Sequence, residues 1–394
     1  MSSRKSSGIT RVQAIISTTR FLGTRAMGPL DWIGLVVGSV TAVVVLQLIY
    51  LSIVLRWEDD QTVGLGYYGL HSTERDRFKR TLRTHARLLA PILRLSIRFI
   101  RLDFRKSRLQ YRGVSGPMGS CSAETFAAAA AFTPLPEDVF VVTQMKCGTT
   151  WMQYVVYEVV NRGLGDLVAT GTTLYSQCPW LEGRKAVPIE VAPRLGRERP
   201  TRIIKTHLPA DLCPAEPAAR YIYVARHPVS CFASCVDFIR TNVGAMAPPL
   251  AVFEAWFTDP DLMWWGTWSN HVKGWWDRAA RNPNVLVVLF EDMKKDLPSV
   301  VKQVTAFLGV APLSEPELGL VVEKCGFQYM QAHQDLFEMQ PPHILQADAE
   351  LFVRGTAERH KDVPAETRER LAAWAVREMA GSSFPLARAY PDLP

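Results

Sequence analysis

The chain has 394 residues, of which 48% are hydrophobic and 21% charged, so it can bury a sizeable core and is neither a small disulfide-stapled scaffold nor a mostly disordered chain. The net charge is +7, but residues 1–112 hold 19 of the 45 Lys and Arg and only 7 of the 38 Asp and Glu. The basic character therefore describes an N-terminal attachment region and gives no reason to expect a nucleic-acid partner.

The first two segments predict a membrane anchor. Residues 1–31 are basic and rich in Ser, Thr and Arg, a composition that a cleaved transit peptide shares. Residues 32–55 contain no charge over 24 positions, which corresponds to about 36 Å of helix. They predict one transmembrane helix with Trp32 and Tyr50 in the interfacial aromatic belts, and a buried core helix is the alternative.

Residues 56–120 are predicted to form a basic stem. Within them, residues 71–112 carry 13 Lys and Arg against 3 acids, interleaved with Leu and Ile. This pattern predicts an amphipathic helix on a membrane surface with lipid as its partner, and a helix packed on the main domain is the alternative. We expect a single-pass protein of the Golgi, endoplasmic reticulum or another organelle. Arg20 and Arg25 favour a cytosolic N-terminus, whereas the larger basic cluster after the span favours the opposite orientation.

Residues 121–394 are predicted to form an α/β domain. Short apolar runs that read as buried strands alternate with helical patterns. The predicted strands are Val139–Thr143, Arg202–Thr206, Tyr221–Ala225 and Val285–Phe290, and the predicted helices are Thr149–Asn161, Ser230–Arg240 and Pro298–Leu308. The repeated order of strand and helix predicts a mainly parallel central sheet flanked by helices, with its ligand site beyond the carboxyl ends of the strands.

The loop after the first strand is suited to holding an anion. It reads K-C-G-T-T-W over Lys146–Trp151. Gly148 permits close backbone approach, the helix start offers unpaired N–H groups, and Lys146 supplies a full charge. The loop is not a Walker A motif, because its lysine precedes the glycine. A capped helix start without a ligand is the alternative.

Two further strand ends carry polar side chains. His207 follows the strand at residues 202–206, and imidazole is matched to taking a proton near neutral pH. Arg226 follows the next strand and suits a second phosphate, and Ser234 lies two turns into the following helix. A structural histidine and an ordinary ion pair are the alternatives.

In this order and spacing, the segments resemble the P-loop-like sulfotransferases that use 3′-phosphoadenosine 5′-phosphosulfate, most closely the cytosolic type, over about residues 130–390. The family's loop T-Y-P-K-[SA]-G-T-T-W is followed here over Thr143–Trp151 except at Gln144, Met145 and Cys147. The K-T-H-L-P segment is present as Lys205–Pro209. Later stretches are similar to G-S-W-x-x-H-V-x-x-W-W and Y-E-D-[ML], at residues 265–276 and 290–293.

The resemblance implies a sulfotransferase fold, this phosphosulfate as co-substrate and no required metal. It also implies a set of nucleotide-binding residues, which in this chain are Lys146, Cys147, Gly148, Thr149, Thr150, Trp151, Arg226, Ser234, Phe290, Arg354 and Gly355. Within this set, Thr149 and Thr150 would contact the 5′-phosphate and Trp151 would stack on adenine. Phe290 stands where the family has a tyrosine near adenine.

The resemblance also implies the catalytic roles. His207 would be the base that deprotonates the acceptor hydroxyl, with Lys205 beside the transferring sulfonate. Lys146 would contact the oxygen that bridges sulfur and phosphate, while Arg226 and Ser234 would hold the 3′-phosphate. In-line transfer needs such positioning, charge stabilisation of the leaving phosphate and one proton acceptor.

The chain departs from the family near its C-terminus. Where the family has R-K-G-x-x-G-D-W-K, residues 353–361 retain Arg354 and Gly355, which are expected to reach the 3′-phosphate. The family's dimer segment is not recognisable after Lys361, so the sequence predicts no oligomeric state.

The acceptor is predicted to be a small hydrophobic hydroxyl compound, namely an alcohol, phenol, sterol or lipid. The prediction depends on the aromatic-rich residues 240–268, and a core role for these rings is the alternative. A P-loop kinase and a non-catalytic nucleotide-binding membrane scaffold are the competing functions. The missing Walker A spacing counts against the kinase, and the presence of Lys146 and His207 counts against the scaffold.

Overall fold

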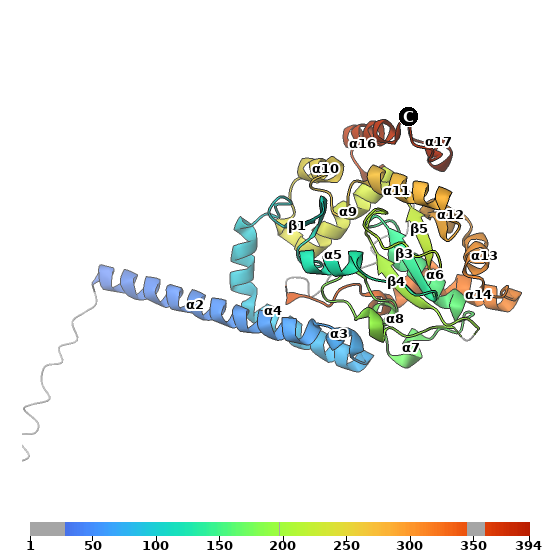
Figure 1. The fold of residues 1–394 in the computed structure, drawn as a ribbon. Coiled ribbons are helices and arrows are strands. Elements are labelled where there is room, and N and C mark those ends of the chain that lie inside the picture. The colour runs from blue at the N-terminus through green and yellow to red at the C-terminus, as the bar shows by residue number, and fades with distance from the viewer. Residues whose placement is uncertain (1–27, 197, 345–358) are drawn as a thin grey trace, which may run out of the picture. The chain divides into compact units, whose positions relative to one another are not determined.

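The computed structural model describes residues 28–196, 198–344 and 359–394, with side chains left out at 94–99 and 359–360. They belong to two compact units, Met1–Ile53 and Val54–Pro394. The first unit contains the greater part of helix α2, Pro29–Thr62 (Figure 1). Most of the predicted basic segment 1–31 lies outside the described residues.

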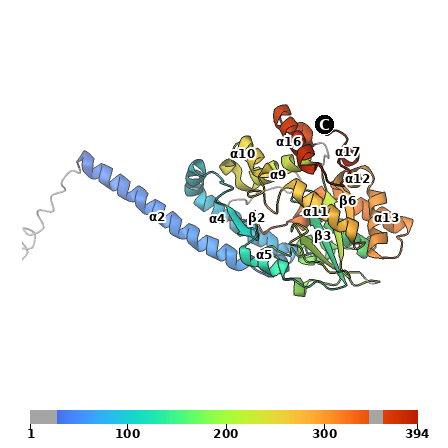
Figure 2. The same ribbon diagram turned by 45° about the horizontal axis from the view of Figure 1, so that its top comes forward.

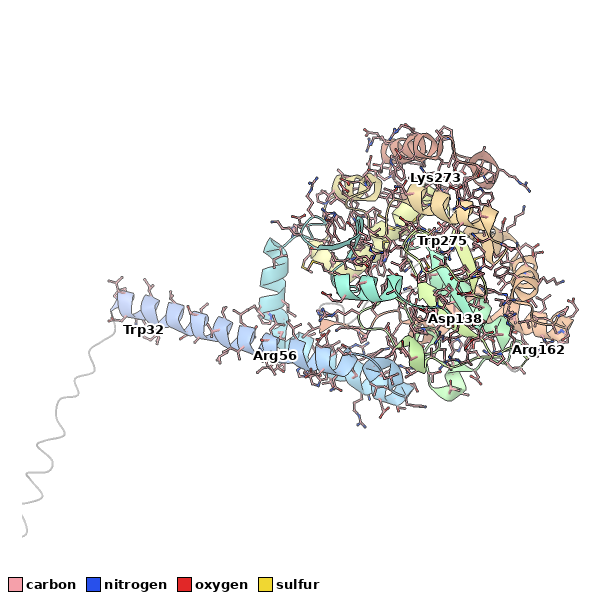
Figure 3. All side chains as sticks on the ribbon, viewed as in Figure 1. Trp32, Arg56, Asp138, Arg162, Lys273 and Trp275 are labelled. Carbon is pink, nitrogen blue, oxygen red and sulfur yellow. The ribbon has the colours of Figure 1, made fainter. Side chains whose placement is uncertain are left out.

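Helix α2 has the length and composition of a membrane span. Within the described parts of the chain, it is the one helix long and apolar enough to cross a membrane. Most of its large apolar side chains between Leu30 and Ile53 are exposed, which counts against the alternative of a buried core helix. Figure 3 shows Trp32 at the start of the uncharged stretch of this helix and Arg56 directly after it.

The stem belongs to the second unit. It contains α3 (Gly66–Gly69), α4 (Ser72–Phe99) and a hairpin of β1 (Arg108–Tyr111) and β2 (Val114–Pro117). Phe104 and Leu109 join the core that includes the central sheet, so the predicted boundary near residue 120 does not separate the two units. Phe78 and Leu82 of α4 are buried, Arg75 donates to the Gly171 carbonyl at 3.1 Å and Lys79 pairs with Glu338, as expected for a helix packed on the main domain.

The central sheet is parallel and four-stranded, in the order β4-β3-β5-β6. Its strands are β3 (Asp138–Thr143), β4 (Arg202–Thr206), β5 (Arg220–Ala225) and β6 (Val285–Leu289). The prediction of an α/β fold with a mainly parallel sheet is therefore confirmed, with strand ends that differ by at most one residue. The β-branched runs suit strands that are covered on both faces.

Helices enclose the sheet in both views of the ribbon (Figures 1 and 2). Helix α6 packs against β3 and β4, and α11 packs against β6. The other α-helices that the structure describes in the second unit are α5 (Ala123–Ala130), α6 (Thr149–Val160), α7 (Leu167–Thr170), α8 (Leu174–Gln177), α9 (Pro228–Val243), α10 (Leu250–Thr258), α11 (Trp268–Arg281), α12 (Phe290–Lys295), α13 (Leu297–Leu308), α14 (Glu315–Lys324), α15 (Phe327–Ala332), α16 (Ala365–Met379) and α17 (Leu386–Ala389).

A buried ion pair fixes the register of two central strands. Asp138 at the start of β3 accepts hydrogen bonds of 2.6 and 2.7 Å from Nε and Nη2 of Arg202 at the start of β4. Figure 3 shows Asp138 inside the unit. Two hydrogen bonds between planar groups orient both side chains. The carboxyl ends of β3 and β4 therefore lie side by side, and the predicted site residues follow them.

Candidate active site

The loop between β3 and α6 makes a sharp turn. Lys146 and Gly148 both have left-handed backbone, with φ of 63° and 101°. A Cβ atom at Gly148 would stand 2.7 Å from the Phe290 ring, so the position needs glycine for both its conformation and its space. The turn leads into the amino end of α6, whose first N–H groups can receive an anion.

The side chains of the loop and helix start face different ways. Thr149 Oγ1 lies 2.6 Å from Thr143 Oγ1, and Thr150 Oγ1 lies 2.9 Å from the Tyr175 hydroxyl. Trp151 Nε1 donates to the Cys325 carbonyl at 2.8 Å, which fixes the indole. The Cys147 thiol points into the protein, 3.5 Å from the Cys231 sulfur, so this residue offers a ligand its main chain alone.

Gln144, one of the departures from the loop motif, joins two distant parts of the chain. Its Nε2 donates to the carbonyls of Trp264 and Gly266, both at 2.8 Å. These bonds join the end of β3 to a turn in which Trp265 has a left-handed φ of 60°. A glutamine directly before the loop offered no sign of this, because its partners are main-chain groups 120 residues away.

His207 is held in a defined tautomer. Its Nδ1 lies 2.8 Å from the Thr143 carbonyl, which can only accept, so Nδ1 carries the proton and Nε2 carries a lone pair. The imidazole packs against the rings of Trp180 and Trp265, at centroid distances of 5.6 and 4.7 Å, and these two rings also contact each other at 6.0 Å. Burial, reinforced by the nearby Lys205 ammonium, lowers the pKa of His207 well below its usual value, so the ring is neutral at physiological pH.

Lys205 is the second-last residue of β4, and its side chain is almost fully buried. Its Nζ lies 3.8 Å from the centre of a Trp180 ring. Burial lowers the pKa of Lys205 to about 7, although the carboxylate of Glu182 acts in the opposite direction. A group that titrates near neutral pH beside a candidate base is typical of an active site.

Glu182 is a further residue near the site that the sequence did not predict. It is completely buried and accepts the His207 N–H at 2.7 Å and the Thr206 hydroxyl at 2.8 Å. It reaches these groups because residues 179–181 run beside β4, with Leu181 N–H bonded to the Lys205 carbonyl. The sequence gives little sign of this, since the segment is irregular.

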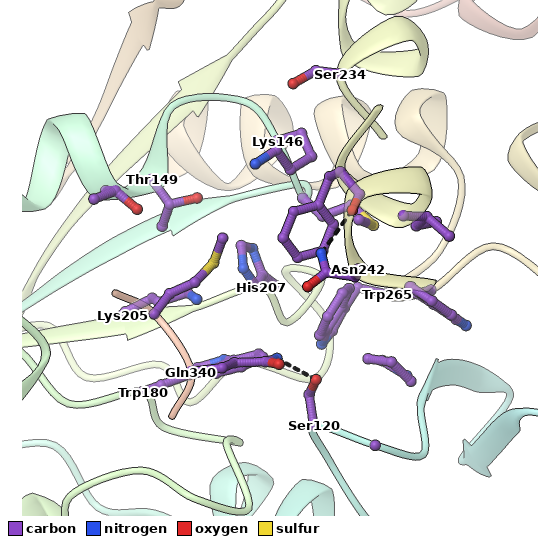
Figure 4. Close-up of a pocket in the computed structure, with 18 of the residues that line it drawn as sticks. Ser120, Lys146, Thr149, Trp180, Lys205, His207, Ser234, Asn242, Trp265 and Gln340 are labelled. Carbon is purple, nitrogen blue, oxygen red and sulfur yellow. Dashed lines mark hydrogen bonds between the residues drawn. The ribbon is translucent and has the colours of Figure 1, made fainter. Parts of the chain in front are cut away.

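Arg226 lies at the end of β5. Its Nη1 donates to the Lys146 carbonyl at 2.8 Å, and its guanidinium carbon lies 4.3 Å from the centre of the Phe290 ring. Its Nε is buried without a hydrogen-bond partner, which leaves one donor available for a ligand. Ser234 projects from α9 into the same space (Figure 4). Helix α9 begins two residues before the predicted start, because Pro228 takes its first position.

A cavity of about 490 Å³ brings these side chains together (Figure 4). Ten predicted site residues line it, namely Lys146, Gly148, Thr149, Thr150, Trp151, Lys205, His207, Arg226, Ser234 and Phe290. Cys147 does not, and Arg354 and Gly355 lie outside the described residues. Among the described residues that line the cavity, five are Lys or Arg and none is Asp or Glu, which favours an anionic ligand.

Part of the cavity wall is apolar. The side chains there include Leu102, Met118, Phe238, Ile239, Val243, Met246, Trp264 and Trp265. The aromatic residues within 240–268 therefore have two roles, because Phe253, Trp256 and Phe257 are fully buried in the core. Within the described parts of the chain, no cluster of His, Cys, Asp and Glu is arranged to hold a metal ion.

Comparison with known proteins finds one family throughout. The family model of the Sulfotransferase domain matches residues 136–383. "Sulfotransferase 1C2" of Oryctolagus cuniculus is 31% identical over 230 residues, which cover 56% of this chain and 75% of that protein. "Sulfotransferase 1E1" of Homo sapiens is 29% identical over 229 residues, 57% of this chain and 76% of the relative.

Two solved structures have the same fold. Retinol dehydratase in complex with androsterone and inactive cofactor PAP gives a TM-score of 0.55 at 20% identity, covering 72% of this chain and 96% of that one. Mouse sulfotransferase SULT7A1 complexed with PAP gives 0.51 at 21% identity, covering 70% and 95%. At these identities, both comparisons establish similarity of fold.

Proposed function

This chain belongs to the sulfotransferase domain family and is a sulfotransferase, and we propose that it moves the sulfuryl group of 3′-phosphoadenosine 5′-phosphosulfate to the hydroxyl of a small hydrophobic acceptor. The observation that carries the proposal is the neutral imidazole of His207, whose Nε2 carries no proton. His207 lines the same cavity as Lys146, Lys205 and Arg226, and no Asp or Glu is among the described residues that line it. A base and a set of cations around one space are what sulfuryl transfer requires.

The residues present fit this donor. The free Nε of Arg226 and the hydroxyl of Ser234 suit its 3′-phosphate. The amino end of α6, with Thr149 and Thr150, suits its 5′-phosphate, and the Trp151 indole suits adenine. When bound, the donor supplies an activated sulfonate whose leaving group is a phosphate. No metal is part of the proposal.

The chain's own groups perform the transfer. His207 Nε2 takes the proton of the acceptor hydroxyl while that oxygen bonds to sulfur and the bond from sulfur to the 5′-phosphate oxygen breaks. Lys146 stabilises the negative charge that develops on the leaving oxygen, and Lys205 stabilises the equatorial sulfonate oxygens. Glu182 helps to position Lys205 and His207, because it accepts hydrogen bonds from the His207 main-chain N–H and from the hydroxyl of Thr206, which lies between them.

The apolar wall supports a hydrophobic acceptor. Trp180 and Trp265 both contact the base and line the cavity, so a flat or elongated apolar body can lie against them with its hydroxyl at Nε2. Androsterone and retinol, which are bound in retinol dehydratase structures of this fold, are both hydrophobic alcohols. Incubating the full chain with sulfur-labelled donor and a panel of alcohols, phenols and sterols tests the activity. Label transfer to none of them, or preferential binding of ATP, would contradict it.

The pH dependence of kcat/KM is expected to reveal Lys205. Its pKa near 7 means that the ammonium loses its proton as pH rises, so the rate falls above about pH 7. His207 stays neutral well below pH 6.5, so the rate does not fall in the range where an ordinary histidine would protonate. Because kcat/KM reports the free enzyme, initial rates at subsaturating acceptor and donor give the profile.

The matched variant is Lys205→Arg, which keeps a charge at all these pH values. It should remove the decline above pH 7, whatever its effect on the absolute rate. The same decline in wild type and variant would show that another group causes it.

We also propose that α2 anchors the enzyme in a membrane as a single-pass protein. Val43 and Leu46 are exposed near the middle of the span. Arginine costs about 2.5–3.5 kcal/mol at the centre of an inserting helix, so Val43→Arg with Leu46→Arg should move the protein from the pellet to the supernatant of alkaline-washed membranes. Wild type should stay in the pellet. The control Leu164→Arg, on the exposed surface of the second unit, should also stay there.

Wild type that is extracted by alkali would contradict the anchor. Retention of the double arginine variant would indicate attachment by another part of the chain, for which the basic stem is the candidate.

A further inference from the structure

Residues 338–344 form part of the cavity wall. Met339, Gln340 and His343 line the cavity, and the Gln340 amide donates to Ser120 Oγ. In Figure 4, Gln340 lies beside Trp180, on the other side of His207 from Ser234. Under the proposed function, Ser234 marks the donor end of the cavity. The segment therefore lies at the end where the acceptor binds.

Glu58, near the end of α2, holds the C-terminal end of this segment. Its side chain is only 2% exposed. Oε2 accepts the main-chain N–H of Ile344 at 3.1 Å, and Oε1 lies 3.6 Å from His343 Nε2. Lys185, which also lines the cavity, approaches Oε1 at 4.0 Å. A buried carboxylate that bonds to a main-chain donor fixes the position of the backbone itself.

The N-terminal end of the segment is held by the stem as well. Glu338 receives a hydrogen bond from the Tyr67 hydroxyl and pairs with Lys79 Nζ at 2.5 Å. The Tyr68 hydroxyl donates to the Glu338 carbonyl at 3.3 Å. Tyr67 and Tyr68 belong to α3 and are buried, and Lys79 belongs to α4. Residues of α3, of α4 and of the end of α2 thus bind both ends of the segment 338–344, which forms part of the proposed acceptor wall.

We propose that Glu58 is a positioning residue for the acceptor, and that the stem is part of the active site. The inference rests on the proposed function, because it concerns the wall against which the acceptor lies. The stem lies wholly outside the part of the chain that the family model matches, which begins at residue 136. The catalytic unit of this enzyme therefore includes chain from about Val54 onward, rather than beginning near residue 121.

The test uses the full chain in detergent with androsterone as acceptor. Glu58→Ala leaves the Ile344 N–H without its acceptor, and the wall segment is released at that end. We expect the KM for androsterone to rise at least about tenfold, which matches the loss of one hydrogen bond to a charged group, while the dissociation constant of the donor product PAP stays within about twofold. Glu58→Gln keeps an oxygen for the N–H and should restore most of the KM.

Two controls separate positioning from folding. Asp60→Ala changes an exposed carboxylate two residues away and should leave both constants unchanged. Tyr67→Phe with Lys79→Met releases the other end of the segment through Glu338 and should raise the same KM. This pair decides the question if Glu58→Ala does not fold.

Hydrogen exchange of residues 338–344 gives a readout that does not require turnover. Exchange should be faster in Glu58→Ala than in wild type and slower again in Glu58→Gln. An unchanged exchange rate in Glu58→Ala would overturn the inference. So would an equal rise in the KM for androsterone and in the dissociation constant of PAP. Absence of sulfuryl transfer by wild type would instead contradict the proposed function and leave the exchange result to judge the role of Glu58.

Discussion

Replacing His207 with glutamine is expected to lower kcat by about 100- to 10,000-fold, the usual contribution of a positioned base. The glutamine amide can still donate to the Thr143 carbonyl, as His207 Nδ1 does at 2.8 Å, so the local packing is preserved. What is lost is the lone pair on Nε2. Single-turnover measurement with saturating donor and acceptor gives the effect on the chemical step.

The same variant should bind PAP as wild type does, because the imidazole is not placed to hold a phosphate. His333→Gln, a substitution at a partly buried histidine that does not line the cavity, should keep the wild-type rate. A His207→Gln enzyme that transfers sulfonate at more than about one tenth of the wild-type rate would remove His207 from the role of base.

Replacing Arg226 with alanine should give the second large effect. A hydrogen bond to a charged group contributes about 1.5–3 kcal/mol, so the dissociation constant for PAP should rise by about 10- to 150-fold. Adenosine 5′-monophosphate, which lacks the 3′-phosphate, should be affected much less. Titration of PAP and of adenosine 5′-monophosphate into wild type and variant gives four dissociation constants. The ratio of the two changes on mutation measures the contribution of the 3′-phosphate.

Arg226 has a second role that this comparison separates. Its Nη1 donates to the Lys146 carbonyl, so its loss is also expected to loosen the loop that we propose holds the 5′-phosphate. An equal rise in the dissociation constants of the two nucleotides would show that Arg226 acts through this loop and not through the 3′-phosphate.

The sequence predicted the parts of the fold that depend on local pattern. The strand Arg202–Thr206 is observed with the predicted bounds, because its β-branched Ile203, Ile204 and Thr206 favour a short buried strand. The helix after Thr143 begins at Thr149 as predicted, since Gly148 marks the turn. The hairpin over residues 108–117 was missed, although Gly113 occupies its turn in a left-handed conformation, because its strands are only four residues long.

The candidate site was predictable to the extent that its residues follow strands. Lys205, His207 and Arg226 all lie at the carboxyl ends of β4 and β5, where a parallel sheet places its ligands. Gln144 and Glu182 were not predictable in the same way. Each makes its contacts to groups that are remote in sequence or lie across an irregular segment, and only the folded chain brings these groups within hydrogen-bond distance.

The contact between His207 Nδ1 and the Thr143 carbonyl has an evolutionary consequence. The acceptor of this bond is a main-chain oxygen, which every amino acid possesses, so substitution at position 143 does not by itself abolish it. The protonation pattern of the imidazole is thereby robust to mutation. The proposed acceptor wall, in contrast, includes side chains such as Trp265 and Met118, which substitutions alter directly. Under the proposed function, descendants of this enzyme could acquire new acceptors while the proposed base stays as it is.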